Sequence, residues 1–259
     1  MIPFLYCIII FFATTMGALV GLGGGVIIKP MLDLVSFHNV ETVGFISAVA
    51  VFSMSVSATI KHIRNKTKFD VPLILFISFG SAVGGVAGNE IFDLLLNKFN
   101  SSIVKGVQGI ILGLLLIAVN IYVNSNAKSF RVKNKFAIVS VGLFLGMSAS
   151  FLGVGGGPIN VAFLVLFFSL SMKESAVYSV AIIFFSQLTK LITIYSANHF
   201  EPFDLTMLLY IIPCAVIGGL LGAKLNKKSN EKTIKIAFTI CVYGVAFVSL
   251  YNGAVGLIG

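Results

Sequence analysis

Two short glycine-rich segments are the part of this sequence best suited to binding chemistry. The segment Gly-Leu-Gly-Gly-Gly at 21–25 recurs 132 residues later as Gly-Val-Gly-Gly-Gly at 153–157. A glycine-rich loop that opens a helix leaves backbone N–H groups free, and the helix dipole adds about half a positive charge there. A proline follows each loop, Pro30 early in the first helix and Pro158 at the predicted first position of the second. Two such helix starts, arriving from opposite faces of a membrane, would form an anion site near its midplane.

Several polar and charged residues near these loops could take part in binding an anion or in coupling its transport to an ion. Lys29 adds a full positive charge just after the first loop, and Asn160 supplies a neutral amide at a comparable point after the second. Asp33 lies one helical turn beyond Lys29 and would neutralise it, and a displaced Asp33 could also carry a proton. Lys190 lies deep in an apolar run, where it would couple to an ion or extend toward the external face.

Two serines, Ser47 and Ser179, share the 132-residue offset of the loops. Hydroxyls in membrane helices usually bond their own backbone, but the matched positions favour a place beside the site. The candidate substrate-binding residues are therefore Gly21, Gly23, Gly24, Gly25, Lys29, Pro30, Ser47, Gly153, Gly155, Gly156, Gly157, Pro158, Asn160, Ser179 and Gln187. Asp33 and Lys190 are candidate ion-coupling residues, and we predict no catalytic residue, metal site or cofactor.

The composition indicates that lipid surrounds the elements carrying these residues. Of 259 residues only 10% are charged and 58% are hydrophobic, whereas a soluble domain has about 25% charged residues. This excludes a soluble or disulfide-stapled protein, so we interpret Cys7, Cys214 and Cys241 as packing residues. Although the net charge is +9, we expect no nucleic-acid partner because the cations are confined to short clusters between apolar runs.

The apolar runs predict an all-α polytopic membrane protein. A span needs about 20 residues, and candidates are 43–60, 71–96, 103–124, 174–197, 205–223 and 234–258. The runs 2–37 and 136–172 are too long for one span and are broken by the glycine loops. Each is predicted to be a hairpin of two helical pieces, 2–20 with 26–37 and 136–152 with 158–171. The total is about 8 full spans, or 10 helical segments.

Three clusters, at 61–68, 128–135 and 224–235, hold 13 of the 18 basic residues. The positive-inside rule makes them cytoplasmic, with the cation-poor connections and both termini external. The chain also repeats: the glycine loops, the serines, and Gly-Gly-x-x-Gly at 84–88 and 218–222 recur in one order. We therefore predict two repeats, 1–127 and 128–259, within one membrane domain. The basic loops alternate oppositely in the two halves, so the repeats are inverted, as in many secondary transporters.

The loop-and-proline pattern at 21–32 and 153–164, with the serines and the Gly-Gly-x-x-Gly segments, resembles the sulfite exporter TauE/SafE family over nearly the whole chain. The resemblance implies a plasma-membrane permease for small sulfur-containing anions such as sulfite or organosulfonates, working in the exporting direction. Two positions depart from the family pattern. Pro158 directly follows its loop, with Ala162 farther on, and Lys29 is not a general family feature.

Other functions remain open at this point. An anion channel shares many of these features, and a homodimer is an open alternative for the assembly. An intramembrane serine protease is less well supported, because the segment at 146–150 ends in Ser where G-x-S-x-G requires Gly. Such a protease also needs a general base near the membrane midplane, and the histidines His38, His62 and His199 all lie toward segment ends. The Gly-Gly-x-x-Gly segments are interpreted as helix-packing contacts.

Overall fold

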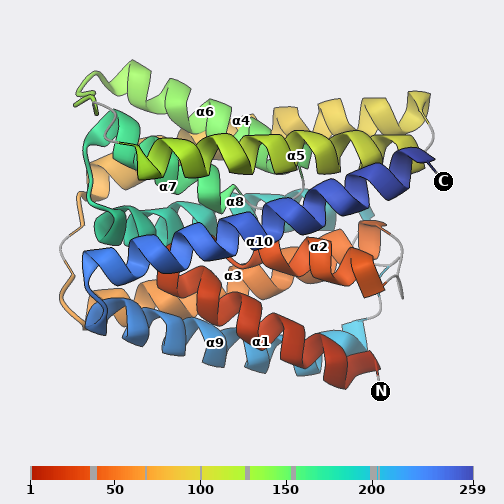
Figure 1. The fold of residues 1–259 in the computed structure, drawn as a ribbon, viewed down its shortest axis with the longest axis horizontal. Coiled ribbons are helices and arrows are strands. Elements are labelled where there is room, and N and C mark those ends of the chain that lie inside the picture. Colours follow the sequence, from red (N-terminus) through yellow and green to blue (C-terminus); the bar gives the residue numbers. More distant parts are fainter. Residues whose placement is uncertain are drawn as a thin grey trace.

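The computed structural model is a bundle of helices with both chain termini at one end (Figure 1). It describes residues 2–35, 40–67, 69–99, 101–125, 129–152, 156–198, 203 and 205–258. The helices are α1 (Ile2–Val20), α2 (Gly25–Val35), α3 (Val40–Arg64), α4 (Val71–Lys98), α5 (Ser101–Asn124), α6 (Lys135–Leu152), α7 (Gly157–Phe168), α8 (Met172–Asn198), α9 (Leu208–Lys228) and α10 (Glu231–Ile258), with a 3₁₀ turn η1 (Leu205–Met207) before α9.

Eight of these helices are long and apolar enough to cross a membrane. The other two, α2 with 11 residues and α7 with 12, would measure only about 16 and 18 Å at 1.5 Å per residue. That is about half of a ~30 Å hydrocarbon layer. The predicted all-helical class, with eight spans and ten segments, is confirmed.

The two short helices belong to hairpins that return to the end from which they entered. Gly21, Gly23 and Gly24 have φ values of 80°, 76° and 70°, a left-handed region that glycine adopts without strain. The chain can therefore reverse between α1 and α2. Gly156 has φ 72° just before α7. Pro158 is the second residue of α7 rather than the first, because Gly157 already belongs to the helix.

Helices from the two halves of the chain pack in pairs. α1 lies along α9, α4 along α6, and α5 along α10, while α3 and α8 contact each other and the partner pairs. Glycines permit these contacts: a Cβ on Gly84 would lie 2.0 Å from the Leu143 carbonyl oxygen, and one on Gly222 would lie 2.3 Å from that of Thr15. The interpretation of the Gly-Gly-x-x-Gly segments as packing contacts is confirmed.

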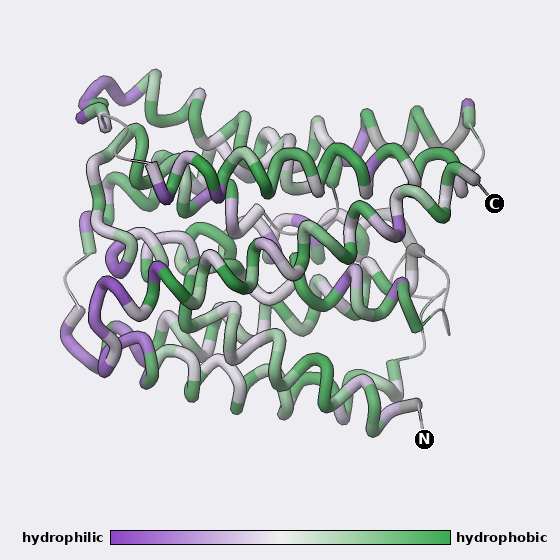
Figure 2. The backbone as a smooth tube through the Cα atoms, viewed as in Figure 1, coloured by the Kyte–Doolittle hydropathy of each residue, from purple (hydrophilic) through white to green (hydrophobic). Residues whose placement is uncertain are grey.

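The described parts of the three basic clusters lie together at the end opposite the termini (Figure 2). Lys227 Nζ donates to Asn65 Oδ1 at 3.3 Å, which joins the third cluster to the first. The backbone N–H of Phe130, in the second cluster, donates to the Leu166 carbonyl near the end of α7. We call the end that holds these three clusters the basic end, and the end that holds both chain termini the terminal end.

Candidate functional site

The tip of the first hairpin meets the start of α7 inside the bundle. A Cβ on Gly157 would lie 1.9 Å from the Leu22 carbonyl oxygen, so only glycine allows the two segments this approach. Gly21 packs equally tightly on α8, where an added Cβ would be 2.4 Å from the Ala176 Cα. The first loop is therefore held between elements of the second half of the chain.

Ser179 links these segments. Its hydroxyl donates to the Gly21 carbonyl at 2.7 Å and approaches the Gly157 carbonyl at 3.5 Å. The side chain is fully buried and bonds across elements rather than within its own helix. Ser47 is also buried, on α3. Gly153 and Gly155 of the second loop lie outside the described residues.

The first loop itself satisfies part of the α2 N-terminus. Gly25 N–H donates to the Gly23 carbonyl at 2.8 Å, and the N–H groups of Ile27 and Ile28 both donate to Gly24. In α7, Asn160 N–H donates to the Gly156 carbonyl at 2.8 Å. These bonds occupy several of the donors that the sequence pattern assigned to an anion.

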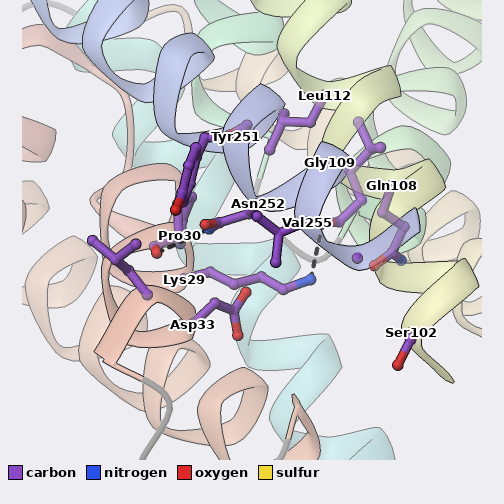
Figure 3. A pocket seen from close by; sticks show the side chains of 14 residues that line it. Lys29, Pro30, Asp33, Ser102, Gln108, Gly109, Leu112, Tyr251, Asn252 and Val255 are labelled. Carbon is purple, nitrogen blue, oxygen red and sulfur yellow. Dashed lines mark hydrogen bonds between the residues drawn. The ribbon is translucent and has the colours of Figure 1, made fainter. Parts of the chain in front are cut away.

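A cavity of about 510 Å³ opens between α2, α5, α10 and the end of α6 (Figure 3). Its polar lining residues from these helices include Lys29, Asp33, Gln108, Ser249 and Asn252. The lining extends toward the terminal end through Leu34 near the end of α2 and Ser102 near the start of α5. The cavity therefore runs from that end to the C-terminal end of α6, where the second hairpin begins its turn.

Lys29 reaches across this cavity to the second hairpin. Its side chain is 8% exposed, and Nζ donates to the carbonyl of Leu152, the last residue of α6, at 3.4 Å (Figure 3). Gln108 Nε2 donates to the neighbouring Phe151 carbonyl. A helix C-terminus carries about half a negative charge, which a cation stabilises. Lys29 thus lies against a helix C-terminus, whereas the sequence pattern predicted a place beside helix N-termini.

Three further predicted residues lie away from the cavity lining. Asn160 on α7 and Gln187 on α8 are buried, and Lys190 on α8 is half-buried. The positive charges of Lys190 and Lys29 nevertheless repel each other. Lys29, Pro30 and Asp33 are brought together in the cavity, and Gly21, Gly157 and Ser179 meet at the hairpin contact.

Sequence reasoning missed the polar residues that α5 and α10 contribute. Gln108 is 5% exposed and Ser249 is 2% exposed, although both lie in long apolar helices. Asn252 Nδ2 donates to the Pro30 carbonyl at 3.3 Å, which ties α10 to α2 (Figure 3). An isolated amide in an apolar span was the available signal, since such groups need a polar neighbour. Among the described residues, no cluster of His, Cys, Asp and Glu could hold a metal ion.

Residues 6–249 match the sulfite exporter TauE/SafE family. The chain is 29% identical to the probable membrane transporter protein YunE of Bacillus subtilis, over 93% of this chain and 94% of that protein. It is 25% identical to a probable membrane transporter protein of Methanocaldococcus jannaschii, over 90% of this chain and 89% of that protein.

Proposed function

Because the chain belongs to the sulfite exporter TauE/SafE family and is a multi-pass membrane transporter, we propose that it carries small sulfur-containing anions by alternating access. The observation that carries this proposal is the buried Lys29 side chain, which lines the cavity and donates to the Leu152 carbonyl at the end of α6. Sulfite and organosulfonates are the substrate candidates, and export is the proposed direction.

The charge balance inside the bundle supports an anionic substrate. Lys190 is near enough to Lys29 for the two like charges to repel each other, and Asp33 is the carboxylate on the same helix as Lys29. Removing charge from water costs several kcal/mol per ion unless a counter-charge is near. A negatively charged substrate would therefore serve as a counter-charge to the Lys29 ammonium in this cavity. Asp33, which lines the cavity beside Lys29, is the proposed site for a coupled proton.

Unequal packing along α5 and α10 supports alternating access. The cavity lies between α2 and the terminal-end parts of α5 and α10. The corresponding region beside α7, toward the basic end, is filled by buried apolar side chains, among them Val161, Leu116 and Phe238. A substrate could therefore reach Lys29 from the terminal end, while packed side chains of α5, α7 and α10 lie between Lys29 and the basic end. A separate cavity of about 410 Å³ lies at the basic end, between α4, α6 and the end of α7.

We further propose that residues 1–127 and 128–259 are inverted repeats that exchange these packing states. Helix contacts support this, because α1 with α9 and α6 with α4 are the same pairing with the halves exchanged. Phe52 of α3 stacks on Phe184 of α8, its counterpart at the 132-residue offset, with centroids 5.6 Å apart. In an inverted repeat the two halves can exchange conformations, and this exchange would convert an outward-open form into a nearly equivalent inward-open form.

The proposed location is the cell membrane, with the basic end cytoplasmic and both termini external. The gathering of the basic loops at one end supports this orientation through the positive-inside rule. In the packing arrangement described, the cavity would then face outward.

The test is anion flux in proteoliposomes. Lys29→Met should lower the flux at least about tenfold, since a hydrogen bond to a charged group contributes roughly 1.5–3 kcal/mol. Asp33→Asn should keep flux but remove its response to an imposed pH gradient. Lys98→Met, at the end of α4, is the matched control and should leave flux unchanged. Equal flux in wild type and Lys29→Met would reject the site. Flux that shows neither saturation nor counterflow stimulation would indicate a channel instead.

A further inference from the structure

We propose that the separate cavity at the basic end, which we call the basic-end cavity, binds the phosphate head group of an anionic phospholipid from the surrounding bilayer. This cavity lies between α4, α6 and the end of α7 and has a volume of about 410 Å³. Among the described residues, none that lines it also lines the cavity around Lys29. The lipid would therefore be a second ligand, distinct from the transported anion.

The lining of the basic-end cavity has an excess of positive charge. Arg131, Lys133 and Lys135 all line it, and Asp70 is the one carboxylate among its described lining residues. The Asp70 side chain already accepts the Leu73 N–H at 3.1 Å as the N-cap of α4. Three cations against one engaged carboxylate favour a ligand with a phosphate group, to which Arg and Lys donate charge-assisted hydrogen bonds.

Contacts to neighbouring helices hold these cations at the cavity. In the connection before α6, the Val132 N–H donates to the Phe167 carbonyl near the end of α7 at 2.9 Å. Lys135 Nζ lies 5.6 Å from the centre of the Phe76 ring on α4, within the range of a cation–π contact. The basic residues are therefore arranged around a cavity, whereas cations on a free loop would have no fixed geometry.

The basic-end cavity lies at the level where the apolar outer surface of the bundle begins. α4 and α6 pack against each other at one edge of the bundle (Figure 1). Val71 at the start of α4 is 55% exposed, and Phe136 at the start of α6 is 86% exposed. Outward apolar side chains on membrane helices contact lipid, so the cations beside them lie at head-group depth. Basic pockets at this depth on the cytoplasmic side bind anionic head groups, which fits the proposed orientation.

The apolar part of the lining favours a lipid over a free phosphate ion. The described apolar lining residues include Leu73, Phe76, Ile138, Phe168 and Leu170. A phosphate group displaces on the order of 60–90 Å³, two to three waters at ~30 Å³ each. The remaining volume can take the glycerol backbone of a phospholipid and the first methylene groups of its chains. A free phosphate ion would contact the cations and leave these apolar side chains uncovered.

The test is a lipid titration of the purified full-length protein, followed by native mass spectrometry. The probes are phosphatidylglycerol, the zwitterionic phosphatidylcholine, and the soluble phosphate ester glycerol 3-phosphate. We expect wild type to retain one phosphatidylglycerol at least tenfold more tightly than either of the other two. Equal retention of phosphatidylcholine would overturn the proposed site. Glycerol 3-phosphate bound as tightly as phosphatidylglycerol would assign the cavity to a soluble phosphate ester and would also overturn it.

Two triple variants test whether the lipid binds in this cavity. The first removes the three lining cations: Arg131→Gln, Lys133→Gln and Lys135→Gln. The matched control removes the same charge around the turn between α9 and α10: Lys224→Gln, Lys228→Gln and Lys232→Gln. All six side chains are exposed, so both variants should fold. Each basic residue near anionic lipid contributes roughly fivefold in binding, so the first variant should bind phosphatidylglycerol at least about tenfold more weakly and the control should bind it as wild type does.

Two results with these variants would overturn the lipid site. Equal losses in both would mean that the whole basic end attracts anionic lipid without a specific site. Unchanged retention in the first variant would mean that the lipid binds elsewhere. Neither variant changes a residue of the cavity around Lys29, so the proposed anion transport could hold after either result.

Discussion

Ser179 shows how one hydroxyl positions two segments that are far apart in sequence. It donates to the carbonyl of Gly21 in the first loop and lies near that of Gly157 at the start of α7. A buried carbonyl in a loop within lipid depends on such a donor, because no water replaces it. The left-handed backbone at Gly21 directs this carbonyl toward α8 instead of into a helix.

At the residue scale, Ser179→Ala should destabilise the protein by about 1–3 kcal/mol, the cost of leaving one buried group unsatisfied. Thermal unfolding of the detergent-purified variant measures this loss. Ser186→Ala on the same helix is the control, since the Ser186 hydroxyl donates within its own helix to the Ile183 carbonyl and its loss should change stability much less. Equal stabilities for the two variants would contradict a structural role for the Ser179 bond.

Close contact between α4 and α6 depends on glycines in both helices. A Cβ on Gly146 would lie 1.9 Å from the Ser81 carbonyl oxygen, and one on Gly80 would lie 2.2 Å from that of Val139. The obstacle is backbone in both cases, so a side-chain rotation cannot relieve it. Without a hydrophobic driving force between helices in lipid, this close backbone packing is the main source of their association.

At the element scale, Gly146→Val should separate α4 from α6 and destabilise the bundle by about 3 kcal/mol or more. Size-exclusion profiles after stepwise heating report the loss. Gly244→Val is the matched control, because a Cβ at Gly244 has no atom within 4 Å among the described neighbours. A Gly146→Val variant as stable as this control would mean that the two helices do not approach as closely as described.

The molecule as a whole has a polarity along the bundle axis. Basic loops gather at one end, both termini lie at the other, and the cavity extends toward the terminal end. Toward the basic end, Ile234, Phe238 and Val242 of α10 pack in the apolar core. These features together give the proposed orientation and the proposed outward-facing access.

At the scale of the molecule, single cysteines on a cysteine-free background should label asymmetrically in intact cells. An impermeant thiol reagent should reach Phe99→Cys at the terminal end, and Asn230→Cys at the basic end only after lysis. Val255→Cys in the cavity should label from outside and be protected by a bound sulfonate, whereas Val242→Cys in the packed core should stay unlabelled. Labelling of Asn230→Cys in intact cells would reverse the orientation.

The sequence by itself determined the membrane class, the ten helical segments and the two hairpins. Apolar run length is set by bilayer thickness, and a glycine loop in a long run must break the helix, so both are local properties. The gathering of the basic loops at one end also followed from the positive-inside rule. The glycine contacts between helices were predictable as packing, although their partners were not.

Tertiary structure alone decided what surrounds each polar residue. Lys29 was expected beside helix N-termini, but its ammonium lies against the Leu152 carbonyl, 123 residues away along the chain. Gln108 and Ser249 belong to no sequence motif, and they come to line the cavity only because α5 and α10 pack beside α2. Sequence spacing orders residues along one helix, whereas a cavity depends on how separate helices are rotated and packed. That rotation is set by side-chain contacts summed over the whole bundle.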